Sequence, residues 1–330
     1  MQKAINSLFL ILAISILASS CSKDNNPDTN PTTPTDPTSP PGTQPGTGDL
    51  PDTLGAGWQK IKVDTTVGFT DIFFVDNNNG FLCGESYIGK STDGGLTWKK
   101  VLPESIKGVY VNIFFVDANT GWVFGGTNSN AMRTIDGGNT WLSVGRGIIF
   151  DGQFFDAKNG FVIAEGFGVF KTSDGGVTFQ SVSGFNARSL FFQDKNKGWV
   201  SGKGLIKTTD GGTTFTNLTD AIPIESYAMQ FTDSLHGWIA GGASIYRTVD
   251  GGATVESIRN GQINSDISFF DNNNGFILSG TKIFSTSDGG KTLQLQCVIH
   301  KNSPYEIHFT DSSHGWAAGP GGYIYKYVKP

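Results

Sequence analysis

Carboxylate side chains recur at fixed spacing along this chain of 330 residues and are the first candidates for chemistry. Six stand in the motif Ser/Thr-x-Asp-x-Gly-x-Thr, at Asp93, Asp136, Asp174, Asp210, Asp250 and Asp288. Seven more begin the motif Asp-x-x-x-Gly-aromatic, at Asp76, Asp117, Asp156, Asp194, Asp233, Asp271 and Asp311. Such oxygen-rich turns could bind calcium, but glycine stands at position 5 of the Asp76 turn and no Glu follows at EF-hand spacing. We therefore expect structural carboxylates that accept hydrogen bonds from their own turns.

The two motifs alternate and define a repeat of 38 to 41 residues. Residues 71–101 show its pattern of short strand segments and turns as DIFFVD, NNN, GFLCG, ESY, IGKST, DGG and LTWKKV. This pattern predicts four short antiparallel strands in each repeat. Repeated four-stranded sheets arranged around an axis form a propeller. The sequence therefore predicts an all-β, seven-bladed propeller over residues 54–330.

The last repeat lacks its final strand, because the chain ends after GWAAG and YIYKYV with no motif of the first kind. Before the first repeat, the segment GWQKIKV at residues 57–63 matches the fourth-strand segment TWKKV. We predict that this N-terminal strand, which contains Trp58, completes blade 7 and covers an otherwise open sheet edge.

Composition excludes several function classes. Glycine, at 45 residues, and aromatic residues, at 12%, favour many turns between short strands. A formal net charge of -5 argues against a nucleic-acid partner held by a basic surface. Four His and three Cys argue against a rich metal site, and we expect no cofactor. Cys83 and Cys297 fall in blades separated by another blade, too far apart for a disulfide, so we expect two buried free thiols.

The N-terminus has the features of an export signal. An apolar run from Leu8 to Ala18 follows Lys3 and is too short to span a bilayer. The run ends in small residues before Cys21, which resembles the lipobox of bacterial lipoproteins, and the following SKDNN resembles the surface-export tag of Bacteroidetes-type lipoproteins. We predict a signal peptide at residues 1–20 and lipidation of Cys21. An ordinary signal peptide with an incidental cysteine is the alternative.

Residues 21–53 are predicted to form a disordered tether behind that anchor. Residues 22–53 hold eight of the thirteen prolines and almost no large apolar side chains, so this segment cannot bury enough surface to fold. We accordingly expect a cell-envelope protein, an outer-membrane lipoprotein whose propeller is exposed at the cell surface.

Propeller topology sorts the loops onto two faces. The turns between first and second strands share one face with the six Asp motifs, and we call it the turn face. The loops between second and third strands and the crossings between blades lie on the other, the loop face, where variable loops favour binding. Arg and Tyr dominate interface energetics. The candidates that we assign to these loops are Tyr87, Arg146, Arg188, Tyr227, Arg259, Tyr305 and Glu306. Exposed loops carry polar residues in any case, so the inventory alone does not establish a site.

The motif Ser/Thr-x-Asp-x-Gly-x-Thr-Trp, which reads STDGGLTW at residues 91–98, resembles the Asp box, or BNR repeat, of sialidases, sortilin-type receptors and photosystem II assembly factors. The whole repeat is similar to the single-propeller photosystem II stability and assembly factor family. That resemblance implies a non-enzymatic scaffold with an arginine-bearing binding surface. By analogy, Arg146, Arg188 and Arg259 would form it.

Two functional hypotheses remain open at this point. The first is a monomeric scaffold that binds an envelope or extracellular protein or peptide. The second is a glycan-binding or glycoside-hydrolysing protein similar to sialidases, which would need clustered arginines, a Tyr nucleophile with a Glu, and an acid/base Asp. The Arg-Ile-Pro motif of that family is absent, and all seven Trp are assigned to packing, which weakens the glycan hypothesis.

Overall fold

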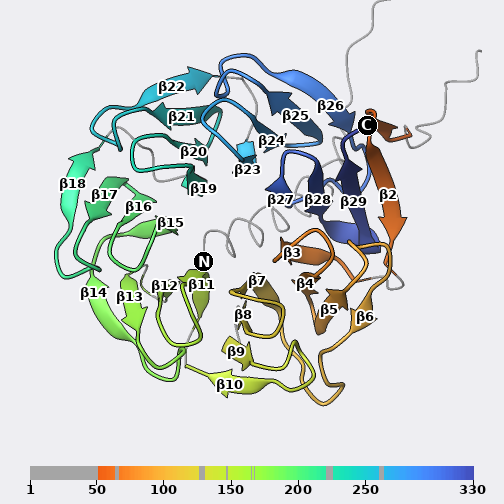
Figure 1. The fold of residues 1–330 in the computed structure, drawn as a ribbon, viewed down its shortest axis with the longest axis horizontal. Coiled ribbons are helices and arrows are strands. Elements are labelled where there is room, and N and C mark those ends of the chain that lie inside the picture. The colour runs from red at the N-terminus through yellow and green to blue at the C-terminus, as the bar shows by residue number, and fades with distance from the viewer. Residues whose placement is uncertain are drawn as a thin grey trace, which may run out of the picture.

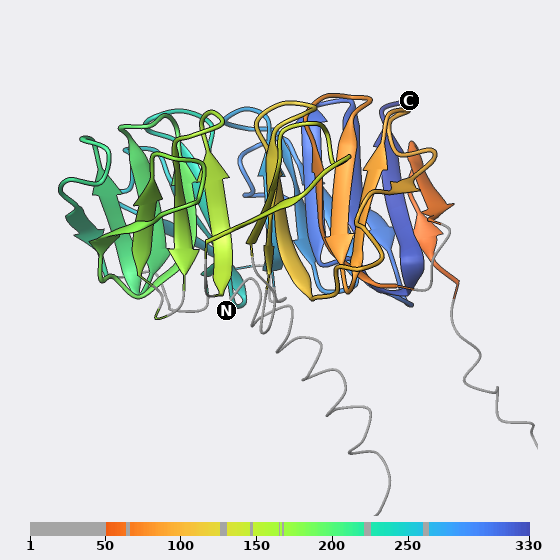
Figure 2. The same ribbon diagram turned by 90° about the horizontal axis from the view of Figure 1, so that it is seen from below.

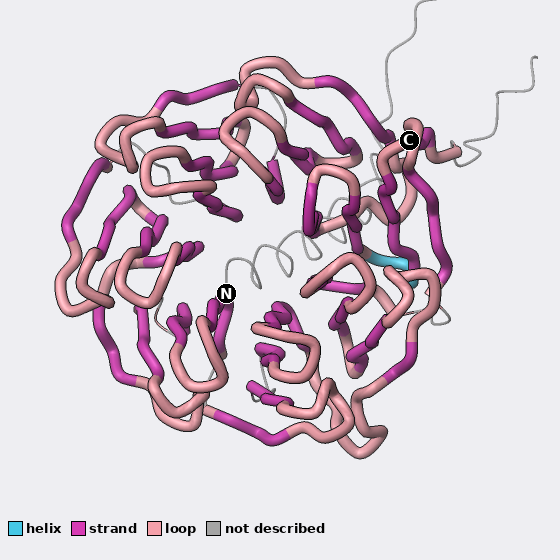
Figure 3. Tube along the Cα trace, viewed as in Figure 1, coloured by secondary structure: helices cyan, strands magenta, loops and turns pink. Residues whose placement is uncertain are grey.

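The computed structural model describes residues 51–63, 67–125, 131–145, 148–164, 166, 168–220, 226–259 and 264–330. The predicted signal peptide, Cys21, the tether up to residue 50 and Arg146 lie outside these residues. Seven antiparallel sheets stand around a central axis (Figures 1 and 3). Their strands run roughly along that axis, so the connections gather on two opposite faces (Figure 2). The predicted seven-bladed propeller is confirmed.

The blades follow the chain, and each runs from its innermost strand outward. Blade 1 consists of β3 (Phe69–Phe74), β4 (Gly80–Gly84), β5 (Tyr87–Ser91) and β6 (Lys99–Lys100). Blade 2 consists of β7 (Tyr110–Phe115), β8 (Gly121–Gly125), β9 (Ala131–Thr134) and β10 (Leu142–Val144). Blade 3 consists of β11 (Ile149–Phe154), β12 (Gly160–Ala164), β13 (Val169–Thr172) and β14 (Gln180–Ser183). Blades 4 and 5 consist of β15 (Ala187–Phe192), β16 (Gly198–Gly202), β17 (Gly204–Thr208), β18 (Thr216–Thr219); and β19 (Ser226–Phe231), β20 (Gly237–Gly241), β21 (Ser244–Thr248), β22 (Glu256–Arg259).

Blades 6 and 7 take strands from both ends of the chain. Blade 6 consists of β23 (Asn264–Phe269), β24 (Gly275–Ser279), β25 (Lys282–Thr286), β26 (Gln294–Val298) and the added outer strand β1 (Thr53–Leu54). Blade 7 consists of β27 (Glu306–Asp311), β28 (His314–Ala318), β29 (Tyr323–Val328) and the outer strand β2 (Trp58–Lys62), with the 3-10 turn η1 (Pro320–Gly322) before β29. Figure 1 shows β2 along the outer edge of β29.

The N-terminal segment holds blades 6 and 7 together. Five residue pairs join β2 to β29, from Trp58 with Tyr327 to Lys62 with Tyr323. The Trp58 ring lies 5.2 Å from that of Tyr327 and is 7% exposed. Asp52 accepts hydrogen bonds from Lys60 Nζ at 2.6 Å and from the N–H of His300 at 3.0 Å. The pairing of β1 with blade 6 was not anticipated from the sequence.

Each Asp box is held by its own hydrogen bonds. In blade 3, Asp174 accepts bonds from the N–H and the hydroxyl of Thr178, at 2.9 and 2.6 Å, and from the hydroxyl of Thr172 at 2.9 Å. These bonds, that of the Thr178 side chain first, lower the pKa of Asp174 to about 2. The same pattern recurs at Asp93, Asp136, Asp210, Asp250 and Asp288. The boxes are turn structures, as the sequence indicated.

A repeated hydrogen bond joins a blade to the Asp box of the next. In four blades the donor is the indole N–H of the Trp on the second strand, and the acceptor is the carbonyl of the first glycine of the box. These bonds are Trp122 to Gly175 at 2.9 Å, Trp199 to Gly251 at 2.8 Å, Trp238 to Gly289 at 2.9 Å and Trp316 to Gly94 at 2.9 Å. We call the aromatic residue at this position of the second strand, whether Trp or Phe, the spoke residue.

Blades 1 and 3 have Phe in place of the spoke Trp, and phenylalanine cannot donate. Phe81 pairs across the sheet with Lys90, and Phe161 pairs with Lys171. The ammonium groups of these lysines donate to the carbonyls of Gly137 and Gly211, each at 3.0 Å. Six junctions therefore satisfy the box carbonyl, by an indole or by an ammonium group.

A second set of bridges joins the innermost strands. The amide of Gln153 donates to the Phe192 carbonyl at 2.7 Å and accepts from the Phe192 N–H at 2.8 Å. Gln230 makes the same pair of bonds with Phe269. Between blades 7 and 1, His308 takes this position, and its Nε2 lies 2.9 Å from the Phe74 carbonyl oxygen.

Deleting residues 54–64 should lower the melting temperature sharply. The deletion strips the outer strand from β29 and removes Trp58 from the core, and losing a buried Trp alone costs about 3–5 kcal/mol, or about 10 °C. Circular dichroism melting of the full chain and of the deletion variant measures this. A deletion of residues 30–40, in the predicted tether, is the control and should leave the melt unchanged. An unchanged melt for the first variant would disprove the stabilising role of β2.

Replacing His308 by Gln should make stability less dependent on pH between 7 and 4. Burial lowers the pKa of His308 to about 4, although its bond to Phe74 opposes this effect. Because the folded pKa lies below the ordinary value of about 6.5, the stabilisation is complete above that pH and is lost as the pH falls towards 4. His308→Gln copies Gln153 and Gln230, so it should keep the stability at pH 7 and remove about 1–2 kcal/mol of the acid-induced loss. Urea unfolding at pH 7, 6, 5 and 4 measures this, and parallel curves for the two proteins would refute it.

Candidate functional site

Four of the seven predicted binding residues lie where innermost strands begin, at one end of the central channel. Arg188 and Tyr227 are the second residues of β15 and β19, Glu306 begins β27 and Tyr305 directly precedes it. These innermost strands begin on the loop face, because they end in the turns that contact the Asp boxes, as in the bond from Gly94 N–H to the Asn78 carbonyl. We call Arg188, Tyr227, Tyr305 and Glu306 the channel-mouth cluster.

β-bulges place two members of the cluster. The pairing register shifts across Arg188 between β15 and β16, and across Tyr227 between β19 and β20. A bulge inserts an extra residue and turns its side chain away from the regular alternation. The assignment of five candidates to loops is wrong, because they lie in strands: Tyr87, Arg188, Tyr227, Arg259 and Glu306.

Of the other three predicted residues, the structure describes the side chain of Tyr87 alone. Tyr87 is 7% exposed, and its ring lies 5.7 Å from that of Phe69, so it belongs to the core of blade 1. Arg259 ends β22, but its side chain, like Arg146, lies outside what the structure describes.

The cluster contains groups that donate and accept hydrogen bonds at neutral pH. Arg188 is 7% exposed, and its Nη1 lies 3.3 Å from the Ala187 carbonyl oxygen. Burial raises the pKa of the Tyr305 phenol, which keeps it protonated and able to donate. A protonated phenol is suited to recognition and poorly suited to nucleophilic attack.

A cavity of about 260 Å³ lies among the innermost strands, with Asp71, Asp151, Asp266 and Glu306 in its lining. The three aspartates bridge neighbouring blades. Each carboxylate accepts a hydrogen bond from the backbone N–H of the residue that follows it. Each also accepts one from a backbone N–H of the next blade: Asp71 from Ile113 at 2.8 Å, Asp151 from Leu190 at 3.1 Å and Asp266 from Ile307 at 2.8 Å. Their oxygens are thus engaged in holding the ring together.

The two cysteines of the described residues are buried, and these residues contain neither a group suited to a metal ion nor a helix suited to a membrane. Cys83 and Cys297 are buried free thiols, as predicted, and burial raises the pKa of Cys297 to about 11. Among the described residues no group of His, Cys, Asp and Glu is placed to hold a metal ion. Within the same part of the chain, no helix has the length and apolar character needed to cross a membrane.

Sequence reasoning overlooked the residue that precedes each Asp box. It is basic before every box but one, and it lies beside the spoke ring: Lys90, Arg133, Lys171, Lys207 and Arg247. Before the sixth box it is Ser285. The signal was present in the sequence as a basic residue at constant spacing from each box aspartate.

The sequence model of a family described as photosynthesis system II assembly factor YCF48 matches residues 50–144. A protein of Prochlorococcus marinus (strain MIT 9312), named photosystem II assembly lipoprotein Ycf48, is 46% identical over 44 residues, which are 13% of this chain and 13% of that protein. These matches confirm the predicted resemblance to the assembly factor family in the part of the chain that they cover.

Solved structures share the propeller. A structure titled YCF48 bound to D1 peptide has a TM-score of 0.69 and 20% identity, and the match covers 84% of this chain and 100% of that one. YCF48 from Cyanidioschyzon merolae gives a TM-score of 0.68 with 18% identity over 83% of this chain and 99% of that one. The GH74 enzyme of Niastella koreensis gives 0.64 with 14% identity over 82% of this chain and 53% of that one. At these identities the likeness concerns the fold.

Proposed function

We propose that this chain is a non-enzymatic, lipid-anchored envelope scaffold that binds a protein or peptide on its loop face. The observation that carries the proposal is the channel-mouth cluster, which has Arg188, two tyrosines and Glu306 where innermost strands begin on the loop face. Arg and Tyr are the residue types that anchor protein interfaces. A propeller of the same fold was solved with a bound peptide, which supports this class of ligand.

The positions of the charged residues favour recognition over catalysis. Arg133 and Arg247 lie on third strands of blades 2 and 5, next to Trp122 and Trp238, while Arg188 lies in blade 4. The described arginines therefore do not form the cluster that a sialidase uses for its substrate carboxylate. The cavity aspartates accept backbone hydrogen bonds, which leaves them poorly suited to general acid or base work.

A glycan-active protein is the second candidate, and the likeness to the GH74 enzyme favours it. This chain corresponds to about half of that enzyme, with 53% covered. We accordingly place the glycan-active enzyme second.

The loop-face proposal predicts that arginine substitutions weaken partner capture. The full chain is crosslinked in cells and purified, and the captured proteins are quantified for wild type and for Arg146→Ala/Arg188→Ala/Arg259→Ala. We expect at least a tenfold loss of the main partner, since interface anchors contribute about 2 kcal/mol or more each. Because Arg188 is buried, the double variant Arg146→Ala/Arg259→Ala is tested in parallel and the melting of both is measured.

A charge-matched control separates this surface from a general effect of charge. Lys158, Lys195 and Lys291 are exposed on the turn face, and their triple Ala variant should capture the partner as wild type does. Capture that survives all the arginine substitutions would eliminate the loop-face surface. Turnover of fluorogenic glycosides by the purified chain would overturn the scaffold proposal.

The anchor proposal predicts that Cys21→Ala releases the protein from membranes. Its basis is the small-residue run before Cys21 and the proline-rich segment after it. Metabolic labelling with a fatty acid, followed by membrane fractionation, should show label in wild type and none in Cys21→Ala. Cys83→Ala is the control and should remain labelled. Equal labelling of Cys21→Ala and wild type would exclude lipidation at this residue.

A further inference from the structure

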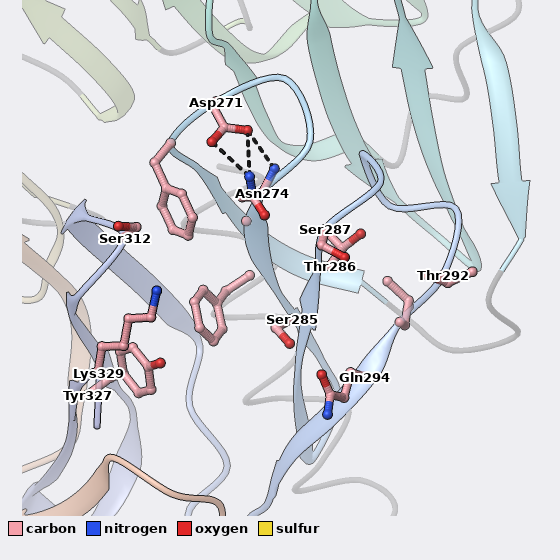
Figure 4. Close-up of a pocket in the computed structure, with 14 residues that line it drawn as sticks. Asp271, Asn274, Ser285, Thr286, Ser287, Thr292, Gln294, Ser312, Tyr327 and Lys329 are labelled. Carbon is pink, nitrogen blue, oxygen red and sulfur yellow. Dashed lines mark hydrogen bonds between the residues drawn. The ribbon is translucent and has the colours of Figure 1, made fainter.

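A cleft of about 490 Å³ opens on the turn face between blades 6 and 7 (Figure 4). Ser285 and the Asp271 turn of blade 6 lie at one side, with Tyr327 and Lys329 of blade 7 opposite. Its volume falls within the range of about 300–1,000 Å³ that is usual for small-ligand sites. It is distinct from the channel-mouth cluster, which lies on the opposite face.

The cleft lies at the junction that has no Asp box to fill it. At the other junctions the first glycine of the next box lies against the basic side chain of the preceding blade, as Gly175 does against Arg133, and Gly176 lies near the Trp122 ring. Blade 7 takes its outer strand from β2, so the chain has no connection from β29 to a fourth strand where a box would stand. The side of blade 6 that faces blade 7 is therefore left uncovered by a box.

Blade 6 lacks the two hydrogen-bond donors that other blades present to the next Asp box. Phe276 replaces the indole donor, and Ser285 replaces the basic residue. The amide of Gln296 donates to the Ser285 hydroxyl oxygen at 2.9 Å, which leaves the Ser285 proton for another acceptor. The wall therefore has neither of the groups that hold a peptide turn at the other junctions, and the charged groups that remain in the lining are Asp271 on this wall and Lys329 on the opposite one.

The remaining lining is rich in amides, hydroxyls and aromatic rings. Within the described chain, the side chains of Gln294, Ser287 and Ser312 make no hydrogen bond to the protein. Asp271 is engaged by the N–H groups of its own turn and by Asn274. The lining also contains the rings of Phe270, Phe276 and Tyr327.

We propose that this cleft binds a short neutral oligosaccharide. Neutral amides and hydroxyls pair with sugar hydroxyls as both donors and acceptors. Phe276 and Tyr327 are 5% and 8% exposed and pack in the core below the cleft, so the half-buried ring of Phe270 is the apolar surface left for the C–H side of a sugar ring. A peptide turn of the Asp-box type fits less well, because the indole and ammonium donors that hold such turns elsewhere are missing here. The site would give a tethered scaffold a second point of attachment, to a glycan.

Isothermal titration of the detergent-solubilised full chain with cellotetraose, xylotetraose, maltotetraose and chitotetraose tests the proposal. We expect at least one of these probes to bind with a Kd of about 1 mM or tighter. Ser285→Lys introduces the basic residue of the other junctions into the cleft, so it should leave the melting temperature unchanged and abolish binding. Gln294→Ala removes one free amide and should weaken binding about 3- to 10-fold.

Gln180→Ala is the matched control, because Gln180 has the same place in β14 at a junction with a box, and it should bind as wild type does. Three outcomes would overturn the proposal. They are no binding of any of the four probes, binding that Ser285→Lys leaves intact, or binding of a peptide with the sequence of residues 91–98 in place of the sugars. The melting curve of Ser285→Lys separates a filled cleft from a misfolded chain.

Discussion

The hydrogen bond from one blade to the Asp-box carbonyl of the next is the interaction on which this propeller depends. A four-stranded blade can bury its two faces only against its neighbours, so the spacing and tilt between blades must be fixed by contacts that cross each junction. A buried carbonyl left without a donor costs about 1–3 kcal/mol, and the bond recurs at six junctions. It therefore links local turn structure to the geometry of the whole ring.

This dependence explains why residue types in different repeats vary together. The box carbonyl requires one donor, which either an indole or an ammonium group provides. Where Trp becomes Phe, as at Phe81 and Phe161, the lysine paired with that ring makes the bond. Blade 6 faces no box and has neither donor, since Phe276 and Ser285 stand in these places. A repeat that departs from the pattern of the others is therefore consistent with the neighbour that it contacts.

Much of the fold could be predicted from the sequence, because its signals are local and repeated. The Asp motifs and their spacing were enough to predict the number of blades, and the likeness of GWQKIKV to TWKKV was enough to place Trp58 beside β29.

The candidate site was predicted less well. Arg188 and Tyr227 were assigned to loops, but bulges extend the innermost strands through them, and bulges leave little trace in a pattern of alternation. The short strand β1 was missed because its two residues, Thr53 and Leu54, are too few to show an alternating pattern or to match a strand segment of the repeat.

The cleft between blades 6 and 7 follows from the way the ring is closed. An Asp box is the connection between the third and fourth strands of a blade, so it requires both strands to be consecutive in the chain. When the fourth strand of the last blade comes from the N-terminus, as β2 does, that connection is cut and no box can form there. The preceding blade then faces an open space, and any buried donor kept from the repeat would remain unsatisfied. The exchange of a basic residue for Ser285 removes that donor, so topology determines where the opening lies and the local sequence determines its chemistry.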